Sequence, residues 1–241
     1  MQLSNLLTDR SRRAEEAWTA LCDCIPVVLG VVPFGITCGI MGFAAKMSGA
    51  ETIAMSVFVF AGASQFIGIT MLGAGVTAWG IIIVTTLMVN LRHLIMGSSL
   101  APYMIKLPLP FQALLAFFLT DEAYALTISR IHKNGYSVLY QLTVSTVLYL
   151  AWVSATAAGV VLSSYISDPL TWGLDFAMPA TFLVLLIPLL KDRTSLIVFG
   201  ISAAVSVFAA QYLPGKWYII IACLTASLVG GLSKGDSKHA Q

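Results

Sequence analysis

The feature that most constrains the fold of this chain is a run of 40 residues, 52–91, without aspartate, glutamate, lysine or arginine. A helix needs about 20 mostly apolar residues to cross the roughly 30 Å of hydrocarbon in a bilayer. The run is therefore long enough to enter the bilayer twice, with a turn at 73–77, where two glycines interrupt it. Further uncharged runs cover 24–45, 134–167, 194–215 and 217–233. This pattern implies an integral membrane protein.

The composition supports the same class. Hydrophobic residues make up 58% of the 241 positions and charged residues only 10%, whereas soluble domains carry about 25% charged residues. Such a chain cannot cover a surface that faces water, which excludes a soluble enzyme, a nucleic-acid-binding protein and a disordered chain. The net charge of +2 is too small to indicate a polyanionic partner.

We expect an all-α fold with about eight transmembrane helices in a single domain, 1–241. None of the apolar segments alternates with the period of two that strands of a membrane barrel require. The predicted spans are 25–45, 53–73, 77–99, 111–130, 138–163, 174–190, 194–211 and 216–233.

Both termini are expected to face the cytoplasm. Residues 1–24 are too polar at their start to supply the apolar core of a signal peptide, and 10–21 are predicted to form a short amphipathic helix along the membrane. The tail 234–241 follows the last span. With the N-terminus inside, nine basic residues face the cytoplasm and three face outward, in agreement with the positive-inside rule. The three outward residues are Lys46, Lys106 and Lys216.

A weak internal repeat is also visible. Residues 60–66 and 176–182 share three identities at an offset of 116. Many transporters are built from repeats, and their binding sites lie where the repeats meet.

Ionisable side chains within hydrocarbon depth are the first candidates for function, because they cost free energy unless paired or hydrated. Asp121 and Glu122 lie near the middle of 111–130, and Asn90, Arg92 and His93 lie in the outer half of 77–99. The helical rise puts Arg92 and Asp121 close enough in depth to pair. One of the acids is a candidate proton carrier. A structural ion pair, or a shifted span that leaves both acids at the interface, are the alternatives.

Helix-breaking residues mark a second candidate site. Broken helices expose backbone N–H groups, and the N-terminus of a half-helix attracts a carboxylate, which suits a zwitterionic amino acid. For the glycines of the first span, such as Gly35 and Gly39, we favour close helix packing instead. Phe34, Phe60 and Phe66 flank the breaks and either line an apolar pocket or face lipid. The predicted substrate-binding residues are Gly62, Ala63, Ser64, Gln65, Phe66, Asn90, Pro179 and Thr181.

Several short motifs, taken in order, resemble the AzlC family, the large subunit of two-component branched-chain amino acid exporters. The resemblance covers roughly residues 20–232. Its motifs are Pro33-Phe34-Gly35, Ala61-Gly62-Ala63-Ser64-Gln65-Phe66, Asn90-Leu91-Arg92-His93, Ser99-Leu100, Thr120-Asp121-Glu122 and Met178-Pro179-Ala180-Thr181-Phe182.

The resemblance implies export of leucine, isoleucine and valine, with methionine as a further candidate, across a bacterial cytoplasmic membrane. It also implies coupling to the proton gradient and a separate AzlD-type subunit of about four helices. No cofactor or metal is expected, and the Cys22-x-Cys24 pair is interpreted as two small hydrophobic residues.

Three other functions compete with this one. An intramembrane serine hydrolase would use Ser64 with His93 as its base, although the second glycine of the nucleophile elbow is absent. A passive channel would build its filter at the break near Gly62. A structural subunit would support a separate permease.

Overall fold

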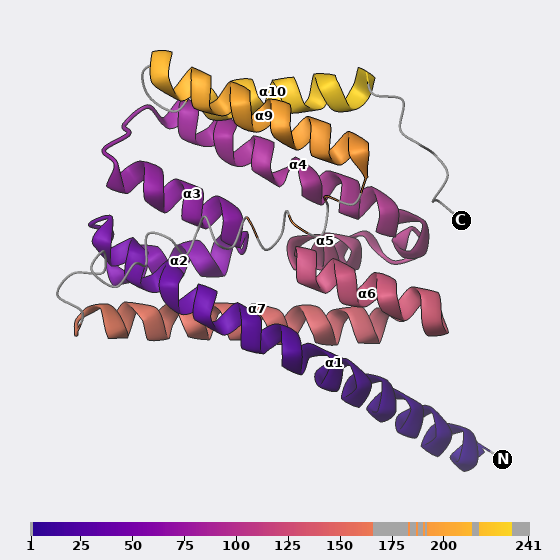
Figure 1. Ribbon diagram of the computed structural model, residues 1–241. Helices are drawn as coiled ribbons and strands as arrows, with labels where there is room; N and C mark the ends of the chain where they lie inside the picture. Colours follow the sequence, from indigo (N-terminus) through magenta and orange to yellow (C-terminus); the bar gives the residue numbers. More distant parts are fainter. Residues whose placement is uncertain are drawn as a thin grey trace.

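The computed structural model describes residues 2–165, 183, 187, 190, 192–213 and 217–232. The secondary-structure elements of more than one residue in these ranges are all helices (Figure 1). The helices are α1 (Gln2–Ala44), α2 (Gly49–Phe58), α3 (Gly62–Gly73), α4 (Trp79–Met104), α5 (Leu109–Phe117), α6 (Asp121–Asn134), α7 (Val138–Ser163), α9 (Arg193–Tyr212) and α10 (Trp217–Leu232).

Four of these helices are long and apolar enough to cross a bilayer: α1 from Arg13 onward, α4, α7 and α9. The predicted spans 25–45, 77–99, 138–163 and 194–211 therefore correspond to α1, α4, α7 and α9. The predicted span 216–233 forms α10, which is shorter, with 16 residues. Most of the predicted span 174–190, and with it the second copy of the weak repeat, lies outside the described residues.

The predicted spans 53–73 and 111–130 are wrong as single crossings. Each region forms a hairpin of two short helices, α2–α3 and α5–α6, of 10, 12, 9 and 14 residues. A ten-residue helix rises about 15 Å, or half of the hydrocarbon depth. Hydropathy records how much apolar chain is present but not whether it turns back.

Each hairpin leaves at the end of the molecule where it entered. At the first hairpin, Gly73 lies against Ala45, since a Cβ at Gly73 would be 3.3 Å from the Ala45 Cβ. At the second hairpin, Leu107 and Tyr136 pack into one cluster with Met104. The two hairpins enter from opposite ends, and their tips meet near the middle (Figure 1).

The two hairpin turns differ in how far the local sequence explains them. At the first tip, Phe60 adopts a left-handed φ of 44°, which separates α2 from α3. At the second tip, the hydroxyl of Thr120 accepts a hydrogen bond from the N–H of Ala123, and two acids follow in the first turn of α6. An N-cap threonine followed by acids is a helix start signal, so the second break was readable in the sequence.

Helices α1 and α7 pack extensively against each other and run in parallel along one edge of the molecule (Figure 1). Small residues allow this close approach: a Cβ at Gly35 would be 2.6 Å from the Ala155 Cβ, and one at Gly39 would be 2.7 Å from the Val160 nitrogen. Gly159 of α7 faces the backbone of Ile36 in the same way. The close-packing interpretation of the first-span glycines is confirmed.

Two further differences from the prediction concern the length of α1 and the position of Lys106. Helix α1 runs without interruption through Pro26 and Pro33, so the separate helix predicted at 10–21 is part of one long helix. Lys106 lies at the same end as Tyr136 and not at the opposite end. The predicted placement of Lys106 on the side opposite Lys133 is therefore wrong.

Candidate functional site

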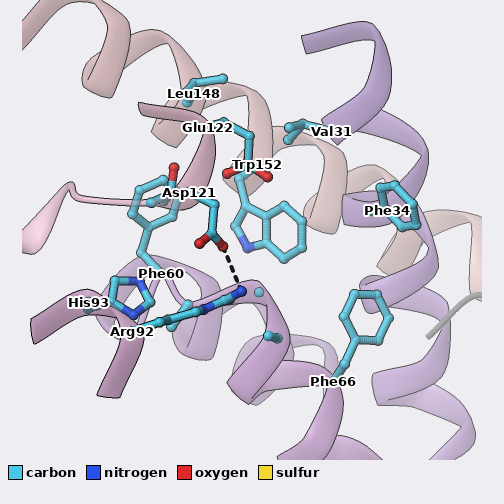
Figure 2. A pocket seen from close by; sticks show the side chains of 14 residues that line it. Val31, Phe34, Phe60, Phe66, Arg92, His93, Asp121, Glu122, Leu148 and Trp152 are labelled. Atoms are coloured by element: carbon cyan, nitrogen blue, oxygen red, sulfur yellow. Dashed lines mark ion pairs between the residues drawn. The ribbon is translucent and has the colours of Figure 1, made fainter. Parts of the chain in front are cut away.

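The tips of the two hairpins, together with α1, α4 and α7, enclose a pocket (Figure 2). Its cavity volume is about 90 Å³, below the range of about 300–1,000 Å³ that is typical of small-molecule sites. The lining residues are Val31, Phe34, Phe60, Ala61, Gly62, Ala63, Phe66, Arg92, His93, Thr120, Asp121, Glu122, Leu148 and Trp152.

One wall of the pocket carries charge. The guanidinium of Arg92 on α4 lies 2.8 Å from the carboxylate of Asp121 at the start of α6. Both side chains keep about a third of their surface accessible, 32% and 30%. The predicted pairing of Arg92 with Asp121 is confirmed, and the dashed line in Figure 2 marks it.

Glu122 has different surroundings from its neighbour. Its carboxylate lies apart from the Arg92–Asp121 pair in Figure 2 and lines the pocket. Within the described part of the chain it makes no hydrogen bond or ion pair. Successive residues of a helix point about 100° apart, so only one of the two acids can face Arg92. His93 lines the same wall, and its Nδ1 is buried without a partner among the described residues.

A second wall is backbone. Ala61, Gly62 and Ala63 at the start of α3 line the pocket, and no side chain caps this helix end. The first N–H groups of a helix have no partner within the helix and carry partial positive charge, which suits a carboxylate. The site predicted at Gly62 and Ala63 therefore coincides with an uncapped half-helix.

The rest of the wall is apolar. Phe34, Phe60 and Phe66 all line the pocket, which favours the pocket interpretation of these rings over lipid contact. Phe60 also packs against Phe118 of the other hairpin and Tyr149 of α7, at ring-centroid distances of 6.3 and 5.0 Å. The aromatic contact thus joins the two hairpin tips beside the pocket.

Two predicted binding residues, Ser64 and Gln65, do not line the pocket. Gln65 is 1% exposed, and its amide bonds to Ser56 and Trp152 inside the helix packing. Ser64 is 5% exposed, and its hydroxyl has no partner among the described residues. The helical period explains the difference, because the face of α3 that presents residues 62, 63 and 66 turns 64 and 65 inward.

The remaining predicted residues divide as follows. Asn90 lies one turn from the pocket but does not line it, and its Oδ1 is buried without a partner in the described residues. Pro179 and Thr181 lie outside the described residues. Ser64 and His93 do not form the nucleophile–base hydrogen bond that a serine hydrolase needs.

The sequence predictions missed five pocket residues: Val31, Ala61, Thr120, Leu148 and Trp152. Trp152 had a readable signal. Tryptophan in membrane proteins gathers near the interfaces, whereas Trp152 lies at the centre of the uncharged run 134–167. The two aliphatic residues had none, since a valine or leucine in an apolar helix is ordinary.

Comparison with known proteins shows the family to which this chain belongs. The family described as AzlC protein matches residues 26–166. The inner membrane protein YgaZ of Escherichia coli is 30% identical over 216 residues, which cover 85% of this chain and 86% of that protein.

Two other relatives are similar over most of their length. An uncharacterized membrane protein of Archaeoglobus fulgidus is 34% identical over 170 residues, 70% of this chain and 73% of the relative. The branched-chain amino acid transport protein AzlC of Bacillus subtilis is 29% identical over 189 residues, 76% of this chain and 73% of that protein. No solved structure matches. On its sequence this chain is a member of the AzlC family of membrane proteins, with a membrane transport role.

Proposed function

We propose that this chain is a secondary transporter subunit that exports branched-chain amino acids across the bacterial cytoplasmic membrane. The observation that carries the proposal is the composition of the pocket at the hairpin tips. It combines an uncapped helix N-terminus, a cation, a free carboxylate and an apolar wall. A zwitterion with an aliphatic side chain needs these same partners.

Each part of such a substrate has a counterpart. The substrate carboxylate would bind the N–H groups of Gly62 and Ala63, with Arg92 as a nearby positive charge. The ammonium group would bind Glu122, which has no other partner in the described residues. The aliphatic side chain would lie against rings such as Phe34 and Trp152.

Proton coupling is assigned to the acids of α6. Asp121 is paired with Arg92. Glu122 has no such partner, so it is the better proton carrier of the two. Protonation of Glu122 would remove the charge that holds the substrate ammonium and would promote its release.

The direction of transport and the partner are proposed by analogy with the exporter family that the sequence motifs resemble. We expect export, and a small AzlD-type subunit of about four helices as the partner. The name of the Bacillus subtilis relative refers to branched-chain amino acid transport, which agrees with this substrate class.

The test is leucine flux in proteoliposomes that contain this chain with and without the small subunit. An imposed pH step should drive saturable flux that requires both subunits and is inhibited by isoleucine and valine. Non-saturable conductance would indicate a channel instead. Full transport by the partner alone would indicate a structural subunit.

A further inference from the structure

Trp152 forms part of the pocket wall and is almost completely enclosed. Its side chain lines the pocket, although the residue is only 8% exposed. The ring lies against the first residue of α3, since a Cβ at Gly62 would be 3.0 Å from the Trp152 Cη2. The uncapped helix end and the indole are therefore adjacent. When the carboxylate of an amino acid substrate binds at Gly62, the side chain of that substrate lies beside Trp152.

A closed set of buried hydrogen bonds fixes the orientation of this indole. Trp152 Nε1 donates to Gln65 Oε1 at 3.0 Å, and Gln65 Nε2 donates to Ser56 Oγ at 2.8 Å. Ser56 Oγ donates to Thr156 Oγ1 at 2.9 Å, and Thr156 Oγ1 donates to the carbonyl of Trp152 at 2.9 Å. The chain of bonds returns to the residue where it began and joins α2, α3 and α7.

This network is stable only if each buried polar group in it keeps its hydrogen-bond partner. A buried amide or indole N–H without a partner costs about 1–3 kcal/mol, and phenylalanine would fill an apolar wall without this requirement. The indole here is instead pinned by the tip of the first hairpin. An indole ring that is held by these hydrogen bonds cannot rotate to make room for a larger substrate side chain. Its position therefore sets the depth of the pocket.

We propose that Trp152 is the residue that limits the pocket to branched aliphatic side chains, and that Gln65 is the positioning residue that holds it. The inference rests on the proposed function and names the origin of its substrate selectivity. Gln65 acts through Trp152 and does not touch the substrate.

The test compares phenylalanine with leucine as substrates in proteoliposomes that contain both subunits. Trp152→Leu should deepen the pocket and raise the phenylalanine-to-leucine ratio of kcat/KM by at least about tenfold, because one or more methylenes in an apolar pocket are worth roughly 10–200-fold. Trp79→Leu is the matched control, since Trp79 is 65% exposed and lies outside the pocket. An unchanged ratio in Trp152→Leu overturns the inference.

Gln65→Leu keeps the volume of the side chain but removes its hydrogen bonds to Trp152, Ser56 and Cys38. It should raise the same ratio as Trp152→Leu, with a larger KM for leucine and a smaller change in kcat. Gln141→Leu is its control, because Gln141 is equally buried but bonds to Tyr136 outside the pocket. An equal loss of flux for all substrates in Gln65→Leu would indicate a purely structural role and overturn the positioning role.

A spectroscopic measurement does not depend on altered packing at the site. The chain has five tryptophans, and replacing all except Trp152 with phenylalanine makes its emission specific. Leucine should shift or quench that emission with the concentration dependence of transport. Leucine flux without any change in emission overturns the inference and leaves the proposed function intact. Absence of leucine flux in the unmodified two-subunit preparation refutes both.

Discussion

At the scale of single residues, the pocket separates two neighbouring acids by their surroundings. Asp121 is neutralised by Arg92, whereas Glu122 lines the same pocket apart from that pair. The difference arises from the 100° step between successive helical residues. The two positions should therefore give different phenotypes when their charge is removed.

Glu122→Gln should abolish leucine efflux driven by a pH gradient, because an amide cannot carry the proton. Membrane insertion and the unfolding temperature should stay unchanged, since Glu122 has no partner to lose within the described residues. The measurement is leucine flux with and without a pH step. Normal proton-driven flux in this variant would refute the assignment of Glu122 as the carrier.

Arg92→Gln should weaken apparent leucine affinity. A hydrogen bond to a charged group is worth about 1.5–3 kcal/mol, so the expected rise in KM is roughly tenfold to a hundredfold. The control is Ser64→Ala, which the pocket geometry predicts to leave KM unchanged because Ser64 does not line it. A normal KM for Arg92→Gln together with a raised KM for Ser64→Ala would contradict this assignment of the substrate site.

At the scale of elements, the fold depends on the packing of α1 against α7 and on the meeting of the two hairpin tips. The first was easier to predict from the sequence than the second. The glycines of α1 were recognisable as a packing motif, and their contact with α7 follows that expectation. The hairpin tips were harder to predict. The break near Gly62 was expected, but the one at Thr120 was not, because its start signal lies inside an apolar segment of the length of a span.

Gly159→Val should destabilise the chain by at least about 3 kcal/mol, the upper part of the range for overpacking. Its Cβ would be 2.9 Å from the Ile36 Cα, and a backbone atom cannot move aside as a flexible side chain can. The measurement is thermal unfolding in detergent. Gly80→Ala is the control, since a Cβ at Gly80 meets nothing within 4 Å.

Tyr149→Phe tests the junction of the hairpin tips. The Tyr149 hydroxyl donates to the carbonyl of Val57 at 3.0 Å, and its ring packs against Phe60 and Phe118, each at 5.0 Å. Loss of the hydrogen bond, worth about 1 kcal/mol, should loosen the tips and raise the downhill leak of leucine several-fold with KM unchanged. A leak equal to that of Tyr103→Phe, which alters a tyrosine outside the pocket, would count against this role.

At the scale of the whole molecule, the helix–hairpin order determines which loops share a side. The bounds of α7 were predictable to the residue, whereas α4 continues to Met104, five residues beyond its predicted end at 99. The topology was not predictable, because an apolar segment of 53–73 satisfies the length rule equally well as a crossing or as a hairpin. Only packing between distant segments, such as Ala45 with Gly73, decides between them.

Cysteine labelling in intact cells checks this topology. Cysteines placed at Lys46 and at Gly75 should react with an impermeant maleimide added from the same side. Cysteines placed at Lys106 and at Asn134 should react only from the opposite side. Labelling of Lys46 and Lys106 from one side would restore the arrangement of eight simple crossings and remove the two hairpins.

The meeting of two half-length hairpins at one point also has an electrical consequence. Water that follows each hairpin toward its tip would carry the bulk potential inward from both sides. The transmembrane voltage would then fall mainly across the few side chains between Phe60 and Phe118, which pack at 6.3 Å. Moving one elementary charge through the full potential is worth about 2.3 kcal/mol per 100 mV. A proton that crosses between these side chains would experience most of that energy in one step, so the turnover rate should change with the membrane voltage.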